Sequence, residues 1–395
     1  MLIDIDTAIE DNADKKISKK DRHLNVLMSS TSYPKDLQDW RGRFIANQAG
    51  ALAARDDIRL SLWAPPGVLP PRVSDANSAA DSRWLERLSQ QGGIAHLLRT
   101  RRVMAAGTIV GLLARLGRVY RRQPVDVVHV NWLQNALPLW GTTTPALITV
   151  LGTDFGLLQL PGMKNLLRSV LRQRRAILAP NAEWMQPALE QAFGDLAEVC
   201  PIAFGVDDPW FDVVRRPAEG LTRHWLAVTR LTHHKIGDLF TWGEGLFGET
   251  RQLHLFGPMQ ETVALPAWVH YHGPTHPADL LQNWFPQASG LITLSRHAEG
   301  RPQVMLEAMA AGLPVVASAL PAHRDMLQHQ ATGWITANRE ELSRGLEWLD
   351  EPANNQAVGQ AGRAWVKASV GTWHDCAGRY AAAYSRLLGT AGESR

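Results

Sequence analysis

The sequence is poor in cysteine and contains no long hydrophobic segment. Its 2 cysteines, Cys200 and Cys376, lie far apart among 395 residues, which excludes the disulfide framework of a small secreted protein. The first 22 residues are rich in Asp, Lys and Glu and lack the apolar stretch of a signal peptide. The uncharged run Val103–Ala114 is too short to cross a bilayer. These absences predict a cytoplasmic protein that begins with a flexible tail over residues 1–22.

Acidic residues are absent from two basic stretches, although the net charge of the chain is only +3. Residues 99–122 contain seven arginines and residues 155–182 contain five basic side chains, in both cases without Asp or Glu. Lys164, Arg168 and Arg172 are spaced four apart and therefore share one face of a helix. Such a face is either simply solvated or suited to an anionic membrane surface, and the sequence leaves both readings open. A nucleic-acid partner is not expected, because no recognition motif accompanies the charge.

The length predicts two domains, and 45% hydrophobic with 20% charged residues is typical of a globular protein. Apolar runs of strand length alternate with helical patterns on both sides of residues 201–223, where Pro, Asp and Trp cluster. This alternation predicts α/β domains with mostly parallel sheets, in which ligands bind at the carboxyl ends of the strands. Strands are expected at residues 24–30, 58–63, 126–131, 146–151, 175–180, 224–229, 253–256, 268–272, 291–294 and 315–317. Residues 65–81 are expected to be a loop, and helices are expected over 42–54, 237–247, 277–285, 340–367 and 372–388.

One strand–loop–helix unit carries two carboxylates. After the strand 291–294, Glu299 lies in a loop that leads to a helix over residues 303–311, with Pro302 as the first helical residue. Amides at a helix N-terminus bind anions, and the Glu299 carboxylate can accept hydrogen bonds from sugar hydroxyls. Glu307 lies inside this otherwise apolar helix and therefore needs a partner, either a structural ion pair or the two hydroxyls of a ribose.

Three further loops follow predicted strands. Arg230 and Lys235 bracket one of them and are either surface cations or a pair that converges on a diphosphate. Gly42 opens a helix after the first strand and is either a simple turn glycine or a point where a phosphate or sugar approaches the backbone. Asp154 follows the strand 146–151 and either caps the next helix or binds an acceptor hydroxyl.

Glu299 and Glu307, separated by seven residues within EGRPQVMLEAMAAGLPVVAS, resemble the E-x7-E signature of the family 4 retaining glycosyltransferases. Arg230 and Lys235 resemble the paired donor-phosphate cations of that family, and IAFGVD at residues 202–207 resembles its interdomain segment. The first-domain similarity is looser. It rests on residues 29–53, with Gly42 at the expected place, and on residues 89–99 and 126–133.

The resemblance implies the GT-B fold, an α/β architecture in which two Rossmann-like domains face each other across a cleft. Residues 23–203 would bind the acceptor, residues 204–371 would bind a nucleotide sugar, and residues 372–395 would form a helix that crosses back to the first domain. The implied reaction moves a sugar from a UDP- or GDP-sugar donor to a glycan or lipid-linked acceptor with retention. It would serve surface polysaccharide or glycolipid synthesis at the inner face of the cytoplasmic membrane, without a metal or other cofactor.

The resemblance also implies roles for single residues. Glu299 would contact the donor sugar, and Arg230 and Lys235 would neutralise the leaving diphosphate as the glycosidic bond breaks. The remaining implied donor contacts are Gly42, Gly300, Arg301, Gln303, Val304 and Glu307.

The first domain departs from the family pattern at two positions. Relatives often have His-x-His-Trp where this chain has His129-Val130-Asn131-Trp132, and His-Gly-Thr/Ser-Asp where it has Leu151-Gly152-Thr153-Asp154. Asn131 is therefore a candidate for the catalytic histidine's role and, with Asp154, for acceptor binding. The departures also leave open a degenerate binding subunit, or a sugar-nucleotide epimerase on the same fold.

Metal sites are not expected. Asp4 and Asp6 match the D-x-D pattern of metal-dependent glycosyltransferases, but they lie in the polar tail. His270 and His272 lie on one face of a predicted strand, and a zinc site would require further converging ligands.

Overall fold

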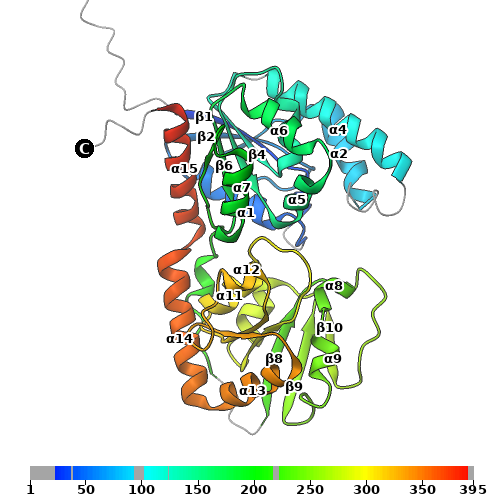
Figure 1. The fold of residues 1–395 in the computed structure, drawn as a ribbon, viewed down its shortest axis with the longest axis vertical. Helices are drawn as coiled ribbons and strands as arrows, with labels where there is room; N and C mark the ends of the chain where they lie inside the picture. The colour runs from blue at the N-terminus through cyan, green and yellow to red at the C-terminus, as the bar shows by residue number, and fades with distance from the viewer. Residues whose placement is uncertain (1–22, 37–38, 93–101, 123, 217–221, 390–395) are drawn as a thin grey trace, which may run out of the picture.

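The computed structural model describes residues 23–36, 39–92, 102–122, 124–216 and 222–389. They form two α/β domains, one above the other in Figure 1, and in each sheet all paired strands are parallel. The first sheet has the strand order β3-β2-β1-β4-β5-β6-β7, and the second has the order β10-β9-β8-β11-β12-β13. In both sheets the order reverses beside the first strand of the domain, the place where doubly wound sheets bind ligands.

The first domain alternates strands and helices up to residue 199. Its central strands β4, β5 and β6 are buried along their whole length, as expected for a parallel sheet covered on both faces. Its elements are β1 Leu24–Ser29, α1 Arg43–Ala53, β2 Ile58–Trp63, β3 Val73–Asp75, α2 Ala79–Gln90, α4 Arg102–Arg122, β4 Val127–Asn131, η2 Leu133–Leu139, β5 Ala146–Val150, α5 Gly152–Phe155, η3 Gly156–Gln159, α6 Met163–Leu171, β6 Ala176–Pro180, η4 Glu183–Met185, α7 Gln186–Phe193 and β7 Glu198–Val199.

The second domain has shorter helices around its sheet, followed by a column of longer helices at the end of the chain (Figure 1). Its elements are η5 Asp208–Trp210, β8 Arg223–Val228, α8 His233–Ile236, α9 Leu239–Gly243, β9 Arg251–Phe256, β10 Val269–Gly273, α10 Pro277–Asp279, η6 Leu280–Trp284, β11 Gly290–Thr293, α11 Gln303–Ala310, β12 Val315–Ser318, α12 Pro321–Arg324, β13 Trp334–Thr336, α13 Arg339–Asp350 and α14 Pro352–Ser369. Helix α15, Trp373–Leu388, follows.

Several local predictions were wrong for identifiable reasons. The segment expected to be a loop at residues 65–81 contains β3 and the start of α2, where Ser78 Oγ accepts a hydrogen bond from Asp81 N at 3.1 Å. The helix expected over 237–247 covers only α9, Leu239–Gly243, and Gly237, whose φ is 54°, instead ends the separate helix α8. The helix expected over 340–367 is two helices, because Pro352 begins a new one.

The chain crosses between the domains at residues 202–206 and again at residues 370–373, and the two crossings are bonded to each other. Val206 N donates to Gly371 O at 3.1 Å. Arg379 Nη2 donates to Ala203 O at 3.0 Å and to Val370 O at 2.7 Å. The connection between the domains is therefore a pair of adjacent segments rather than a single linker.

Helix α15 packs against α1, β5 and β6 of the first domain (Figure 1). Its side chains belong to the apolar cluster on one face of the first sheet. Tyr384 Oη lies 2.6 Å from His129 Nδ1, and Tyr380 Oη lies 3.2 Å from Thr149 Oγ1, all four side chains being buried. The last described helix thus completes the core and a buried polar network of the first domain.

The two domains touch where their facing loops meet. A Cβ atom added to Gly152 of the first domain would lie 2.1 Å from Gly300 N of the second. No helix in the described part of the chain is long and apolar enough to span a membrane.

Candidate active site

Lys235 and Glu299 form an ion pair with 2.6 Å between Nζ and Oε1, and their side chains are 14% and 13% exposed. Lys235 lies in α8, which Thr232 caps by accepting a hydrogen bond from Lys235 N at 3.2 Å. Glu299 follows β11, the strand beside β8 in the sheet. Burial lowers the pKa of Lys235, and the charge of Glu299 opposes that shift. The sheet order thus brings together two residues that the sequence placed in separate loops.

Arg230 lies beside this pair and reaches both domains. Its charge adds to the lowering of the pKa of Lys235. Its guanidinium lies over the ring of Trp40, a first-domain residue, 5.5 Å from the ring centroid. His297 lies near the same cations. Burial lowers its pKa most, and the charge of Lys235 lowers it further. The ends of β8 and β11 therefore concentrate positive charge, as a diphosphate site requires.

The loop after Glu299 is fastened to the first domain by hydrogen bonds. Trp184 Nε1 donates to Gly300 O at 2.8 Å. The Asp325 carboxylate accepts bonds from Glu183 N at 3.2 Å and from Trp184 N at 3.1 Å, and it pairs with Arg301 Nη2 at 2.5 Å. The Arg301 and Asp325 side chains are 6% and 8% exposed. We call this set of contacts the Asp325 latch.

Gly300 lies at a close approach between the domains. A Cβ atom there would lie 2.2 Å from Asn181 Oδ1, so a larger residue would have to displace the Asn181 side chain. The Arg301 side chain is engaged with Asp325 rather than directed to a ligand, so any phosphate contact of residues 300 and 301 would come from their backbone amides.

Gln303 and Val304 form the first turn of α11. Gln303 Nε2 donates to Gly205 O at 2.7 Å, and Val304 packs against the second-domain core. Pro302 is the extended N-cap of α11, with ψ 117°, and not its first helical residue as predicted. The N–H groups of the first turn have no acceptor within the helix itself and suit an anion.

Glu307 lies in α11 and faces the acidic Asp207 and the basic Arg43. Burial, followed by the charge of Asp207, raises the pKa of Glu307 to about 8, while Arg43 opposes the shift. Burial also raises the pKa of Asp207. The sequence predicted a partner for Glu307, and the charged neighbours in the structure are a like charge and one arginine from the other domain.

Gly42 is the N-cap of α1 with φ 65°. A Cβ atom on it would lie 2.6 Å from Tyr33 N, so the turn itself requires glycine. This geometry accounts for Gly42 as a turn residue, and it also places the next residue, Arg43, near Glu307 and Asp207.

Asn131 is completely buried at the end of β4. Its Nδ2 donates to Ser29 O at 3.3 Å, and its Oδ1 has no hydrogen-bond partner among the described residues. The following residue, Trp132, has φ 68°, an unusual value for a non-glycine residue. This burial disfavours the predicted direct contact between Asn131 and a substrate, and Leu151 is likewise buried.

Asp154 is 2% exposed, and both of its oxygens accept backbone hydrogen bonds. Oδ1 accepts from Leu151 N at 2.7 Å and Oδ2 from Leu133 N at 2.8 Å. Burial raises the pKa of Asp154 to about 7, although these backbone donors oppose the shift. Of the two roles that the sequence left open, the geometry favours the cap and disfavours the acceptor ligand.

The histidines of the second sheet form a hydrogen-bonded row rather than a metal centre. His254 lies 3.0 Å from His224 on one side and 3.0 Å from His272 on the other, and it stacks on His270. No cluster of His, Cys, Asp and Glu side chains within the described ranges is arranged to hold a metal ion. Asp4 and Asp6 lie outside these ranges, as does the predicted tail over residues 1–22.

The basic stretch 155–182 is only partly available to a ligand. Arg168 pairs with Asp195, and Arg174 is buried, with Nη2 donating to Leu139 O at 2.8 Å. Lys164 and Arg172 are exposed at the two ends of the shared helix face. Residues 99–101 of the other basic stretch lie outside the described part.

Sequence reasoning missed the residues that join the site to the other domain, namely Trp40, Arg43, Trp184, Asp207 and Asp325. Asp207 closes the segment IAFGVD and Arg43 follows Gly42, so both stood beside positions already of interest. Trp184 and Asp325 carry no local pattern, because their roles arise from contact between the two domains.

Comparisons with known proteins agree with this architecture. Residues 242–350 match the family model described as glycosyl transferases group 1. An uncharacterized glycosyltransferase of Haemophilus influenzae is 34% identical over 70 residues. These residues are 17% of this chain and 20% of that protein, so the chain matches only a fifth of that relative's length.

Solved structures match over most of the chain. Sucrose-phosphate synthase of Thermosynechococcus elongatus has a TM-score of 0.68 at 16% identity over 93% of this chain and 100% of its own. A glycosyltransferase of Rickettsia africae has a TM-score of 0.66 at 13% identity over 94% and 100%. HepE of Anabaena, solved with UDP and glucose, has a TM-score of 0.62 at 14% identity over 92% and 100%. The fold is therefore that of the GT-B glycosyltransferases, and the match over residues 242–350 supports a glycosyltransferase.

Proposed function

We propose that the protein is a metal-independent, retaining glycosyltransferase of the family 4 type, with Glu299 and Glu307 as its E-x7-E pair. The observation that carries the proposal is the partly buried Lys235–Glu299 ion pair with Arg230 beside it, at the carboxyl ends of two adjacent strands. Two partly buried cations next to a carboxylate suit a diphosphate linked to a sugar. The donor is a nucleotide sugar, and UDP is the first nucleotide to test because HepE was solved with UDP-glucose.

In the proposed reaction the acceptor oxygen attacks the anomeric carbon from the side of the leaving group. The bond between that carbon and the diphosphate oxygen breaks, and the same oxygen takes the acceptor's proton. Arg230, Lys235 and the first amides of α11 stabilise the charge that develops on the diphosphate. Bound diphosphate would compete with Glu299 for Lys235, which frees the carboxylate for the hydroxyls of the donor sugar.

Glu307 is proposed to accept hydrogen bonds from the ribose hydroxyls. This carboxylate faces Asp207, a like charge that raises its pKa, and Arg43, which opposes that shift. Two hydroxyl donors would favour the charged form, so the nucleotide would add hydrogen-bond partners to the electrostatic support that Arg43 gives.

The acceptor is proposed to be a glycan or a lipid-linked glycan in surface polysaccharide or glycolipid synthesis, used at the inner face of the cytoplasmic membrane. It would enter beside the loop at residues 151–154, which meets the donor loop at Gly300. In this proposal Asp154 shapes that loop through its two backbone bonds.

A thermal-shift screen of UDP, GDP, ADP and TDP tests donor binding, since a bound nucleotide raises the apparent stability by mass action. One of them should raise the melting temperature, and Lys235→Ala should abolish that rise while the exposed control Lys367→Ala keeps it. No shift with any of the four would contradict a nucleotide-sugar enzyme.

Hydrolysis of candidate donors separates the three readings of the chain. Slow release of UDP or GDP indicates a transferase, a donor with inverted sugar stereochemistry indicates an epimerase, and binding without turnover indicates a degenerate subunit. Asn131→Ala with unchanged turnover would show that Asn131 does not replace a catalytic histidine, in agreement with its burial.

A further inference from the structure

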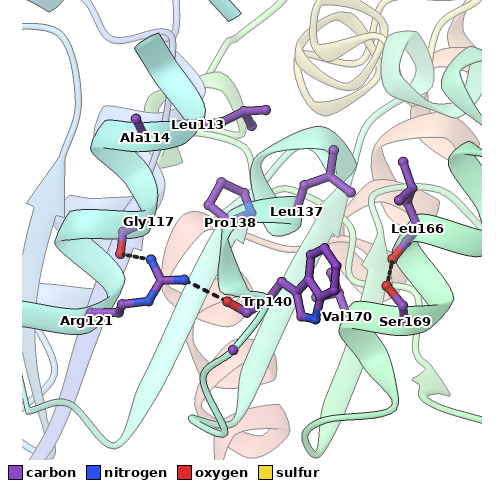
Figure 2. Close-up of a pocket in the computed structure, with 11 residues that line it drawn as sticks. Leu113, Ala114, Gly117, Arg121, Leu137, Pro138, Trp140, Leu166, Ser169 and Val170 are labelled. Carbon is purple, nitrogen blue, oxygen red and sulfur yellow. Dashed lines mark hydrogen bonds between the residues drawn. The ribbon is translucent and has the colours of Figure 1, made fainter. Parts of the chain in front are cut away.

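A hollow of about 510 Å³ opens on the first domain between α4, η2 and α6 (Figure 2), and no described residue of the candidate active site lines it. Its walls are mostly apolar and include Leu113, Leu137, Pro138, Leu166 and Val170. In Figure 2 the Trp140 ring stands between α4 on one side and Leu166 on the other. The volume is in the range of sites that hold small organic ligands.

Large apolar side chains around this hollow are exposed. Trp140 is 59% exposed and Leu166 is 48% exposed. Val110, on α4 one turn before the wall residue Ala114, is 67% exposed. An exposed apolar surface gathered around a hollow is typical of a binding surface, whereas isolated exposed apolar residues are ordinary.

Arg121, the one charged residue among the described residues that line the hollow, is basic. Neither α4 nor α6 contains an acidic residue. Arg118 and Arg122 are exposed on the last two turns of α4, and Arg121 holds the rim by donating to Gly117 O at 2.8 Å and Trp140 O at 2.7 Å (Figure 2). Lys164 is exposed on α6, on the part of its surface farther from the hollow.

We propose that the α4–α6 face, defined by Val110, Arg118, Trp140 and Leu166, docks on an anionic phospholipid bilayer. An acyl chain occupies the hollow, Trp140 and Leu166 enter the interfacial region, and the basic side chains contact the lipid phosphates. Charge complementarity selects this occupant, because an acid-free basic rim around an apolar hollow matches an anionic headgroup on an apolar chain. The inference deepens the proposed membrane location by naming its surface, and it needs no nucleotide chemistry.

Vesicle flotation tests the proposal with the full chain. The protein should float with vesicles of phosphatidylcholine and phosphatidylglycerol and not with phosphatidylcholine alone, and added salt should weaken binding. Leu166→Glu should lower partitioning at least tenfold, while the control Val214→Glu, at an even more exposed apolar position, should not. Arg118→Gln should lower it about fivefold, whereas Lys367→Gln on α14 should leave it unchanged.

A second measurement locates the contact independently of binding strength. Phosphatidylglycerol with brominated acyl chains should quench Trp140, and Trp140→Phe should lose that part of the quenching while still floating. Equal flotation with neutral and anionic vesicles, no flotation at all, or the same loss for Leu166→Glu and Val214→Glu would each overturn the proposal. If the protein is a dimer in solution and Leu166→Glu makes it a monomer, the face binds a second copy of the chain and the proposal is wrong. Each variant should keep its thermal shift with nucleotide, so failure here is distinct from failure of the proposed glycosyl transfer.

Discussion

Glu307→Gln should stabilise the protein without nucleotide, and increasingly so as the pH rises. Glu307 has a pKa of about 8 in the folded protein against an ordinary value of 4.5. A carboxyl whose folded pKa is raised binds its proton more tightly in the folded state, so stability falls between about pH 4.5 and pH 8 as that proton leaves. Glutamine carries no titrating proton and removes this loss.

The size of the effect follows from the same shift. Each pKa unit corresponds to about 1.4 kcal/mol. Glu307 keeps partial contact with solvent and has Arg43 nearby, which reduce the full shift, so we expect a gain of about 1–3 kcal/mol above pH 8. For a domain of this size each kcal/mol corresponds to about 2–4 °C in melting temperature.

Thermal unfolding followed by circular dichroism at pH 5.5, 7 and 9 measures this difference. The Glu307→Gln variant should melt close to the wild type at pH 5.5 and above it at pH 9. Glu86→Gln, an exposed position in the middle of α2, is the matched control and should show no such trend. A difference that is constant across pH, or that shrinks as pH rises, would refute the assignment of a raised pKa to Glu307.

The same variant separates stability from binding. If Glu307 accepts ribose hydroxyls as a carboxylate, Glu307→Gln should weaken UDP binding while it raises the melting temperature. Wild-type UDP binding should release protons near pH 7, because the nucleotide favours the charged form. Calorimetry in two buffers of different ionisation enthalpy measures that release.

Three further results are expected. Lys235→Ala should lower kcat on the order of 10²–10³ in steady-state assays, because the leaving diphosphate loses a buried cation, and a loss below tenfold would contradict that role. Asp325→Ala should lower the free energy of unfolding in urea by about 3 kcal/mol, because Arg301 is then buried without its partner. It should also weaken UDP binding, because the loop after Glu299 loses part of its contact with the first domain. If the variant loses stability but binds UDP normally, the Asp325 latch has only a structural role. Burial, then the neighbouring histidines, lowers the pKa of His254 to about 4, so stability should fall as the pH drops from about 6.5 to 4, and His254→Leu should flatten that fall in melting curves.

The central strands β4, β5 and β6 were predictable because each is a mostly apolar run that a parallel sheet buries on both faces. The strand at residues 58–63 was placed at its observed ends. The three-residue strand β3 was missed, because its sequence Val-Ser-Asp pairs at the sheet edge and carries no apolar run. A Cβ atom on Gly237, where a helix was expected to begin, would lie 2.0 Å from Leu294 O, and the local sequence does not encode this close approach.

In the candidate site, too, single residues were predictable and the contacts between them were not. Arg230, Lys235 and Glu299 were predicted as separate strand-end residues, and the strand order, which no local pattern specifies, brought them together. The burial of Asn131 was not predictable, because it depends on packing of segments distant in sequence. The Asp325 latch joins residues about 140 positions apart across two domains and has no signature in either segment.

Helix α15 has a consequence for how the protein is made. During synthesis the first domain leaves the ribosome long before α15, which follows the whole second domain in the chain. Until then His129 and Thr149 lack their tyrosine partners, and one face of the first sheet lacks its cover. The second domain, whose sheet and core are local in sequence, can therefore mature first, and the domain translated first is completed last.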